Sequence, residues 1–164
     1  MPRLAELVTA SRRVGATASR LRKVAELAAL LRRLQPEEIE IAVGYLSGET
    51  RQGKLGIGYA TLAEARSGGA RRSASLELRA VDDALDALAA TKGKGSAAER
   101  ARRLGALFAR ATRDEQDFLV RLLVGELRQG ALEGVLSDAI ARAASVPPER
   151  VRRAGMLGGR LPSV

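Results

Sequence analysis

The sequence predicts an all-α protein, a compact domain of about eight or nine helices. Apolar residues recur every three or four positions through nearly the whole chain, which is the spacing of one helix face. Hydrophobic residues make up 46% and charged residues 29% of the 164 residues, a balance typical of a globular domain rather than a disordered chain. No segment alternates apolar and polar residues convincingly, as a half-buried strand would. These three observations favour helices throughout.

The first part of the chain is expected to hold a long helix followed by shorter ones. Residues 21–34 carry an apolar face at helical spacing. Pro36 suits the first turn of the next helix, where a missing N–H costs nothing. Thr61 and Glu64 have the spacing of a capping box, which predicts another helix start. The apolar face of the long helix consists of Leu21, Val24, Leu27, Ala28, Leu31 and Leu34.

The second part of the chain has the same kind of pattern. Residues 78–88 form an apolar stripe, and three aspartates of this segment are expected on its solvated outer face. Further apolar stripes occupy residues 97–111 and 118–123. The aspartates are Asp82, Asp83 and Asp86, and the helix starts are predicted from Ser96 and Glu99, from Thr112 and Glu115, and from Pro147–Glu149.

An internal repeat is expected at an offset of 77 residues, with halves at about 17–66 and 94–143. After Glu49 the first copy contains five extra residues in one register, so that Leu55–Gly58 matches Leu127–Gly130. In the other register Arg51–Gly53 matches Arg128–Gly130. The equivalent positions are Leu27, Leu30, Glu37, Glu38, Leu46, Gly48 and Glu49 with Leu104, Leu107, Asp114, Glu115, Leu123, Gly125 and Glu126.

The composition excludes several classes of function. The sequence contains no Cys and no His, which removes thiol nucleophiles, histidine bases and Cys/His zinc sites. Two Tyr and two Phe are too few aromatic residues for a base-stacking platform. No run of about 18 apolar residues occurs, so no membrane span is expected.

The charge points to a polyanionic partner. Lys and Arg number 28 against 19 Asp and Glu, which gives a net charge of +9. Residues 1–36 carry eight positive and two negative charges, and residues 67–113 carry ten and five. Solvated helix faces account for most of these charges individually, but two separated basic blocks also suit a long polyanion.

The segment 91–96, Thr-Lys-Gly-Lys-Gly-Ser, is the most informative motif. Its glycines can form a concave nest of backbone N–H groups, and the helix start that follows adds the positive end of a dipole. Lys92 and Lys94 add point charges, so a phosphate would be well held by these side chains and by the backbone of Gly93, Gly95 and Ser96. The spacing is not that of a nucleotide-binding P-loop. The alternative reading is a flexible connection between two helices.

Two further glycine turns, Leu55–Gly58 and Leu127–Gly130, separate predicted helices. Glycine lets backbone N–H groups approach a phosphodiester closely, although each turn alone is compatible with a purely structural role. Two pseudo-equivalent sites of phosphate contact are therefore predicted, one in each half of the repeat. One consists of Arg128, Gln129 and Gly130, and the other of Gly56 and Gly58 with Lys54 or Arg51.

The order of these motifs resembles the N-terminal DNA-binding domain of ATP-dependent DNA ligases, as in DNA ligase I and its bacterial relatives. The resemblance covers almost the whole chain, and its most specific elements are T-K-G-x-G-S and G-x-L-R-x-G. The matching segments are Ala18–Val24, Tyr45–Gly48, Leu55–Gly58, Leu85–Leu88, Thr91–Ser96, Glu115–Leu119 and Gly125–Gly130.

The resemblance implies a helical domain with two similar halves that holds the minor groove on both sides of a nick in duplex DNA. It adds Arg20, at the start of the first long helix, to the predicted DNA-binding residues, and implies no catalytic or metal-binding residue in this chain. Residues 1–155 would form the DNA-binding domain. Residues 156–164 would form a linker toward catalytic and oligonucleotide-binding domains that the chain lacks.

The parent protein implied by the resemblance is a monomeric, cytoplasmic, nucleoid-associated bacterial ligase that uses ATP and Mg²⁺. The ligase adenylation motif, K-x-D-G, contains none of the four lysines present here. Two other interpretations remain open at this stage. One is a free-standing nucleoid-type DNA-binding protein, and the other is a helical adaptor.

Overall fold

The computed structural model of the chain describes residues 2–127, 130–151 and 153. These residues form eight helices and a short helical segment at 148–151, with two isolated bridges and no strand among them. The prediction of an all-α chain is confirmed. The helices are α1 (Leu4–Ala16), α2 (Arg20–Arg32), α3 (Pro36–Leu46), α4 (Tyr59–Arg66), α5 (Leu78–Ala90), α6 (Ser96–Ala109), α7 (Arg113–Val124) and α8 (Gly130–Ala144).

Two helix starts have the predicted form. Pro36 occupies the first turn of α3. Before α7, the Thr112 hydroxyl accepts the N–H of Glu115 at 3.2 Å and the Glu115 carboxylate accepts the N–H of Thr112 at 2.8 Å. A similar carboxylate cap, not predicted from the sequence, joins Glu38 to the N–H of Gln35 at 2.7 Å.

The other two predicted capping boxes are wrong because glycine precedes each helix. Gly58 precedes α4, so that Thr61 lies inside the helix rather than at its cap. Gly95 precedes α6 with a φ of 79°, a left-handed conformation that suits glycine. Ser96 is therefore the first helical residue, and no side chain caps this helix.

The order of helices occurs twice along the chain. Helix α3 begins at Pro36 and α7 at Arg113, which is the predicted offset of 77 residues. Each of these helices is followed by a left-handed glycine, Gly48 (φ 83°) or Gly125 (φ 82°). Helices α4 and α8 then begin after Gly58 and at Gly130, which favours the register with five extra residues in the first copy. Helices α1 and α5 extend the correspondence to four helices in each half.

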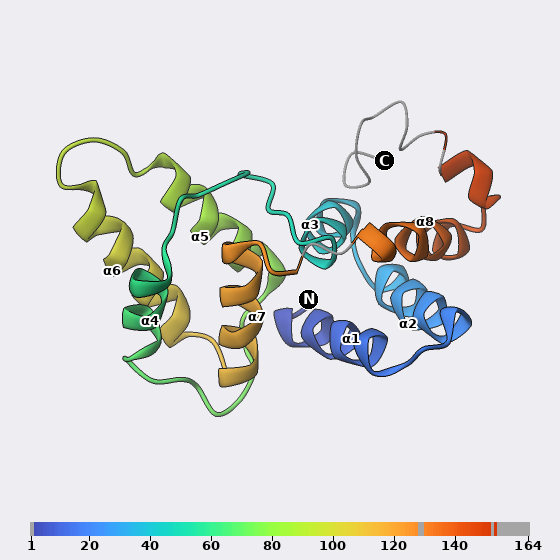
Figure 1. Cartoon of the computed structure of the whole chain (residues 1–164), viewed down its shortest axis with the longest axis horizontal. Helices are drawn as coiled ribbons and strands as arrows, with labels where there is room; N and C mark the ends of the chain where they lie inside the picture. Colours follow the sequence, from blue (N-terminus) through green and yellow to red (C-terminus); the bar gives the residue numbers. More distant parts are fainter. Residues whose placement is uncertain (1, 128–129, 152, 154–164) are drawn as a thin grey trace.

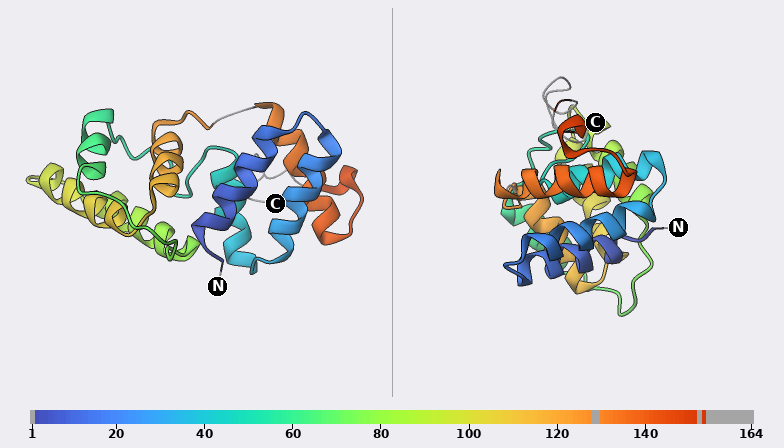
Figure 2. Two further views of the ribbon diagram at one scale, coloured as in Figure 1. Left: turned by 90° about the horizontal axis from the view of Figure 1, so that it is seen from below. Right: turned by 90° about the vertical axis from the view of Figure 1, so that its right-hand side faces the viewer.

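The two halves exchange their fourth helices. Helix α2 packs against α8, and at the equivalent place α6 packs against α4. Figure 1 shows the resulting lobes, with α4–α7 on the left and α1–α3 with α8 on the right. The view from below in Figure 2 gives the same separation along the long axis. A repeat in sequence does not reveal such an exchange, because it cannot tell which copy of a helix packs against which partner.

The two halves meet where α1 and α5 begin. The N–H of Leu4 donates to the carbonyl of Leu76 at 2.8 Å, and the N–H of Leu78 donates to the carbonyl of Pro2 at 3.2 Å. Leu4 and Leu78 hold equivalent positions at the two helix starts, and both are 0% exposed. This reciprocal pair of hydrogen bonds is what a local two-fold relation between the halves requires.

One apolar core runs through both lobes. The predicted face of α2 is buried except at Leu21, which is 79% exposed. Leu21 is therefore wrongly predicted: helical spacing shows which residues share a face, but not how far the neighbouring helices extend along it. Across the described ranges, no helix combines the length and apolar character needed to cross a bilayer.

Candidate nucleic-acid interface

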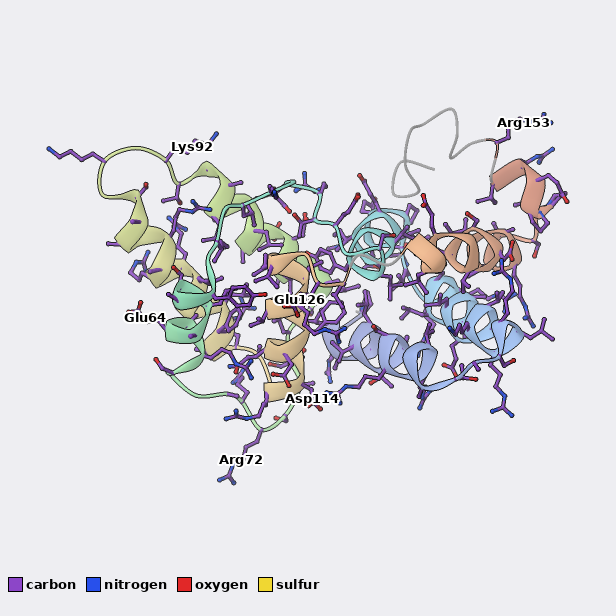
Figure 3. The ribbon with its side chains drawn as sticks, in the orientation of Figure 1. Glu64, Arg72, Lys92, Asp114, Glu126 and Arg153 are labelled. Atoms are coloured by element: carbon purple, nitrogen blue, oxygen red, sulfur yellow. The ribbon has the colours of Figure 1, made fainter. Side chains whose placement is uncertain are left out.

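The loop between α5 and α6 lies at one end of the molecule and carries Lys92 and Lys94 (Figure 3). Both lysines are exposed, and neither forms an ion pair with any residue in the described part of the chain. Gly93 and Gly95 have φ values of 95° and 79°. The N–H of Ser96 donates back to the carbonyl of Gly93 at 3.1 Å, which closes a tight turn at the start of α6. The loop therefore combines two unpaired cations with a helix start that no side chain caps.

The Leu55–Gly58 turn lies against α6 in the same lobe. The Arg100 guanidinium of α6 donates a hydrogen bond to the carbonyl of Leu55. Gly56 has a φ of 65°, and Gly58 precedes α4. The sequence predicted this turn and the 91–96 loop as separate contacts. The structure brings both to one lobe, because α4 packs against α6.

The second lobe holds the other predicted residues that the structure describes. Arg20, the first residue of α2, forms an ion pair with Asp138 of α8, with Nη2 and Oδ2 2.6 Å apart. Ser19 caps α2 by accepting the N–H of Arg22 at 3.3 Å. Helix α8 begins at Gly130. Arg128 and Gln129 lie outside the described residues.

Tyr59 connects α4 to the α7–α8 turn and was not predicted as a site residue. Its side chain is 63% exposed, and its hydroxyl donates to the Glu126 carboxylate at 2.5 Å. This hydrogen bond raises the pKa of the Tyr59 hydroxyl above its usual range. The contact places the start of α4 beside the turn that follows α7. The sequence did contain a signal for Tyr59. The chain has only four Tyr and Phe residues, and Tyr59 directly follows the Leu55–Gly58 turn.

Arg51 and Lys54 were alternatives in the sequence, and they differ in the structure. The Arg51 guanidinium donates to Asp82 Oδ2 at 2.9 Å and to Asp86 at 2.6 Å. Gln52 donates to the same two carboxylates, each at 2.9 Å. We call this cluster of Arg51, Gln52, Asp82 and Asp86 the loop anchor. Lys54 is exposed and has no ion pair with any described residue.

The loop anchor corrects the expectation that the three aspartates of α5 lie on a solvated face. Asp82 is buried, with its side chain 11% exposed, and Asp86 pairs with the same arginine. Hydrogen bonds from Gln52 and Arg51 hold the pKa of Asp86 below its ordinary value. The bonds to Asp82 and Asp86 raise the pKa of Arg51. Only Asp83 of the three is exposed without an ion-pair partner among the described residues.

The same three aspartates form the single cluster of carboxylates close enough to hold a metal ion within the part of the chain that the structure describes. Arg51 lies across two of them, so a cation already occupies the place that Mg²⁺ would take. These residues do not fit a magnesium site.

Comparison with known proteins gives consistent matches. Residues 64–141 match the family described as "DNA ligase N terminus". Proteins named "Probable DNA ligase" from Anaeromyxobacter sp. (strain Fw109-5), Rhodococcus opacus (strain B4) and Mycobacterium avium (strain 104) are 55%, 54% and 52% identical to the chain. The alignments cover 98%, 96% and 98% of this chain but only 31% of each relative.

Proposed function

This chain is related over nearly its whole length to the N-terminal region of DNA ligases, and on that premise we propose that it is the DNA-binding domain of an ATP-dependent ligase. It holds nicked duplex DNA through phosphate contacts along the minor groove. The observation that carries the proposal is the 91–96 loop, where two exposed lysines stand at the start of α6 and, among the described residues, neither has an ion-pair partner and no side chain caps the helix.

The chemistry of this loop suits a phosphate better than a base. Lys92 and Lys94 supply charge without directional preference, and Gly93 and Gly95 leave the backbone open to a close approach. Apart from its own chain neighbours, neither glycine has an atom of a described residue within 4 Å of the position that a Cβ would take. Phosphate contacts of this kind hold the duplex without reading its sequence.

Further contacts extend the proposed interface over both lobes. Lys54, Gly56 and Gly58 form a second contact in the lobe of α6. Arg20 and Gly130 form a contact in the other lobe, and Arg128 and Gln129, which lie outside the described residues, belong to the proposed interface on the sequence resemblance alone. The hydrogen bond from Tyr59 to Glu126 places the start of α4 beside the residue that follows Gly125.

The reaction itself belongs to the rest of the parent protein in this proposal. The curated relatives are about three times as long as this chain, which covers 31% of the length of the first of them. Their remaining length would supply the nucleotidyltransferase and oligonucleotide-binding domains, with ATP and Mg²⁺. This region contributes position, which matters greatly when two strand ends must be held in line. The proposed parent acts as a monomer at the bacterial nucleoid.

A titration of nicked duplex DNA by fluorescence anisotropy at several salt concentrations tests the proposal. Replacing Lys92 and Lys94 by Ala should weaken binding at least about tenfold and lower the salt slope by about two, since two phosphate contacts are lost. The matched control is Arg110→Ala with Arg113→Ala, which removes the same charge. Both arginines are exposed and lack ion pairs with described residues. They lie beyond the opposite end of the 14-residue helix α6, roughly 21 Å away.

Three outcomes would contradict the proposal. An unchanged slope in the lysine variant, with a large loss in the arginine control, would mean that DNA binds a different face. Equal affinity for intact and nicked duplex would favour a nucleoid-type protein, and absence of salt-dependent binding would favour an adaptor.

A further inference from the structure

The connection from α3 to α4 is longer than its counterpart in the second half. It runs from Gly48 to Gly58, whereas Gly125 and Gly130 bound the corresponding connection between α7 and α8. The difference is five residues. Arg51 and Gln52 lie within the longer connection and supply two of the four residues of the loop anchor.

Two attachments restrain this connection on either side of Lys54. Before Lys54, the guanidinium of Arg51 and the amide of Gln52 bind Asp82 and Asp86 of α5 through hydrogen bonds of 2.6–3.3 Å. After Lys54, the carbonyl of Leu55 accepts the hydrogen bond from Arg100 of α6. The exposed ammonium of Lys54 is thus carried by a short stretch attached to two helices.

The contacts of Arg51 and Gln52 with Asp82 are stable because breaking them has a high free-energy cost. The Asp82 side chain is 11% exposed, and a buried carboxylate without hydrogen bonds is strongly disfavoured. Its oxygens accept from both Arg51 and Gln52, and its backbone carbonyl accepts from Gln52 at 3.2 Å. The helix α5 therefore holds the connection at two consecutive residues.

The charge of the loop anchor is unsuited to a direct phosphate contact. One arginine faces two aspartates, so the cluster carries a net charge of −1. Arg51 can reach a phosphate only by leaving both carboxylates. The anchor therefore has a role other than adding positive charge to the interface.

We propose that Asp82 and Asp86 are positioning residues, which act through Arg51 and Gln52 to hold residues 51–58 in the conformation that presents Lys54, Gly56 and Gly58 to a phosphate. This inference rests on the proposed function. A connection already ordered before binding loses less conformational entropy when DNA binds, so the anchor raises affinity without touching DNA. The shorter α7–α8 connection lacks the five-residue segment that bears Arg51 and Gln52.

Asp82→Asn tests the inference against Asp83→Asn as a matched control. Both variants remove one negative charge from α5, but Asp83 is exposed and has no ion pair with a described residue. In Asp82→Asn, hydrogen exchange of residues 51–58 should accelerate about tenfold or more in the free protein, while Asp83→Asn exchanges like the unsubstituted chain. Asp82→Asn should bind nicked duplex about three- to tenfold more weakly than Asp83→Asn.

The sign of the difference in affinity separates positioning from direct contact. If Arg51 were itself a phosphate ligand restrained by Asp82, its release would make Asp82→Asn bind more tightly than Asp83→Asn, and the inference would be overturned. Affinity equal to that of the control would overturn it as well. Asp86→Asn should act in the same direction with a smaller effect, since the Asp86 side chain is 48% exposed and its loss leaves the core intact.

The hydrogen-exchange measurement keeps the inference distinct from the proposed function. Unchanged exchange at 51–58 in both Asp82→Asn and Asp86→Asn, with normal DNA binding by the unsubstituted chain, would overturn the anchor alone. Absence of DNA binding by the unsubstituted chain would overturn the proposed function and, with it, this role of the anchor.

Discussion

Helices α2 and α6 hold equivalent places in the two halves, yet their starts are built differently. Ser19 caps α2, and Arg20 beside it is paired with Asp138 of α8. Within the part of the chain that the structure describes, no side chain caps α6, which follows a left-handed glycine and two lysines without ion pairs. Ser19 caps the first start, whereas the second start has no side-chain cap among the described residues and follows two exposed lysines. Equivalent positions in a duplicated fold can therefore differ in capping and in charge while the helices around them stay alike.

The interior of the two halves differs much less than these connections. Buried glutamates cap both α3 and α7, and left-handed glycines end both helices. The starts of α1 and α5 exchange equivalent hydrogen bonds. The scaffold is thus shared by the two halves, and the candidate binding groups lie in the connections that differ.

The largest expected change in stability comes from substitutions where the two halves meet. These substitutions test whether the two halves are equivalent there. Leu4→Ala and Leu78→Ala should each lower the free energy of unfolding by about 2–5 kcal/mol, because both leucines are fully buried at equivalent positions. Urea unfolding measures the two losses. Similar values would support the equivalence of Leu4 and Leu78, and a loss below about 1 kcal/mol in one variant alone would contradict it.

A smaller effect should distinguish the two capping glutamates. Glu38 Oε2 lies 3.7 Å from the Nε of Arg79, whereas the equivalent oxygen of Glu115 has no hydrogen-bond partner among the described residues. Glutamine keeps an oxygen that can accept the capping N–H, but loses the charge. Glu38→Gln should therefore destabilise the protein about 1 kcal/mol more than Glu115→Gln.

Thermal or urea unfolding of both glutamine variants measures this difference. The reverse order would indicate that the open oxygen of Glu115 contributes more to stability than the Arg79 pair. Glu38 and Glu115 would then be equivalent in geometry but not in energy.

The smallest effect concerns pH and the longer connection. The pKa of Asp86 is lowered from 3.8 in the folded chain, so its pairing contributes fully above the ordinary pKa and is lost as pH falls through the lower, folded value. Amide NMR signals of residues 51–58 should be constant from neutral pH to about 5 and change only below about 3.8. In Asp86→Asn this transition should disappear. A transition retained in the variant would assign it to another group.

The sequence is sufficient to predict the helices and their repeat, since the apolar period and the Gly–Glu turns are local features. The sequence is insufficient where the burial or pairing of a residue depends on another residue far away in the chain. Asp82 was predicted to be solvated because its own segment is amphipathic, whereas Arg51, 31 residues away, covers it. For the same reason the sequence could not show that Arg51 is paired with two aspartates of α5.

Local sequence patterns also predicted a helix start wrongly where the backbone conformation allowed the helix to begin at a different residue. The capping-box spacing at Ser96 is real, but left-handed Gly95 lets the helix begin one residue earlier. The 91–96 loop, by contrast, precedes a helix as predicted, and its two lysines are exposed and without ion pairs among the described residues. Its binding role remains a prediction that the titration above decides.

The exchange of α4 and α8 has the geometry of a domain-swapped homodimer whose two copies are joined through residues 67–77. In a true homodimer every substitution appears twice, so a loop adapted to one strand of a ligand is imposed on the other half as well. Gene duplication and fusion remove that constraint, and each connection can then evolve separately. The five extra residues that include Arg51 and Gln52, and the two lysines before α6, each occur in one half of the sequence and are changes of the kind that only a fused pair can accumulate.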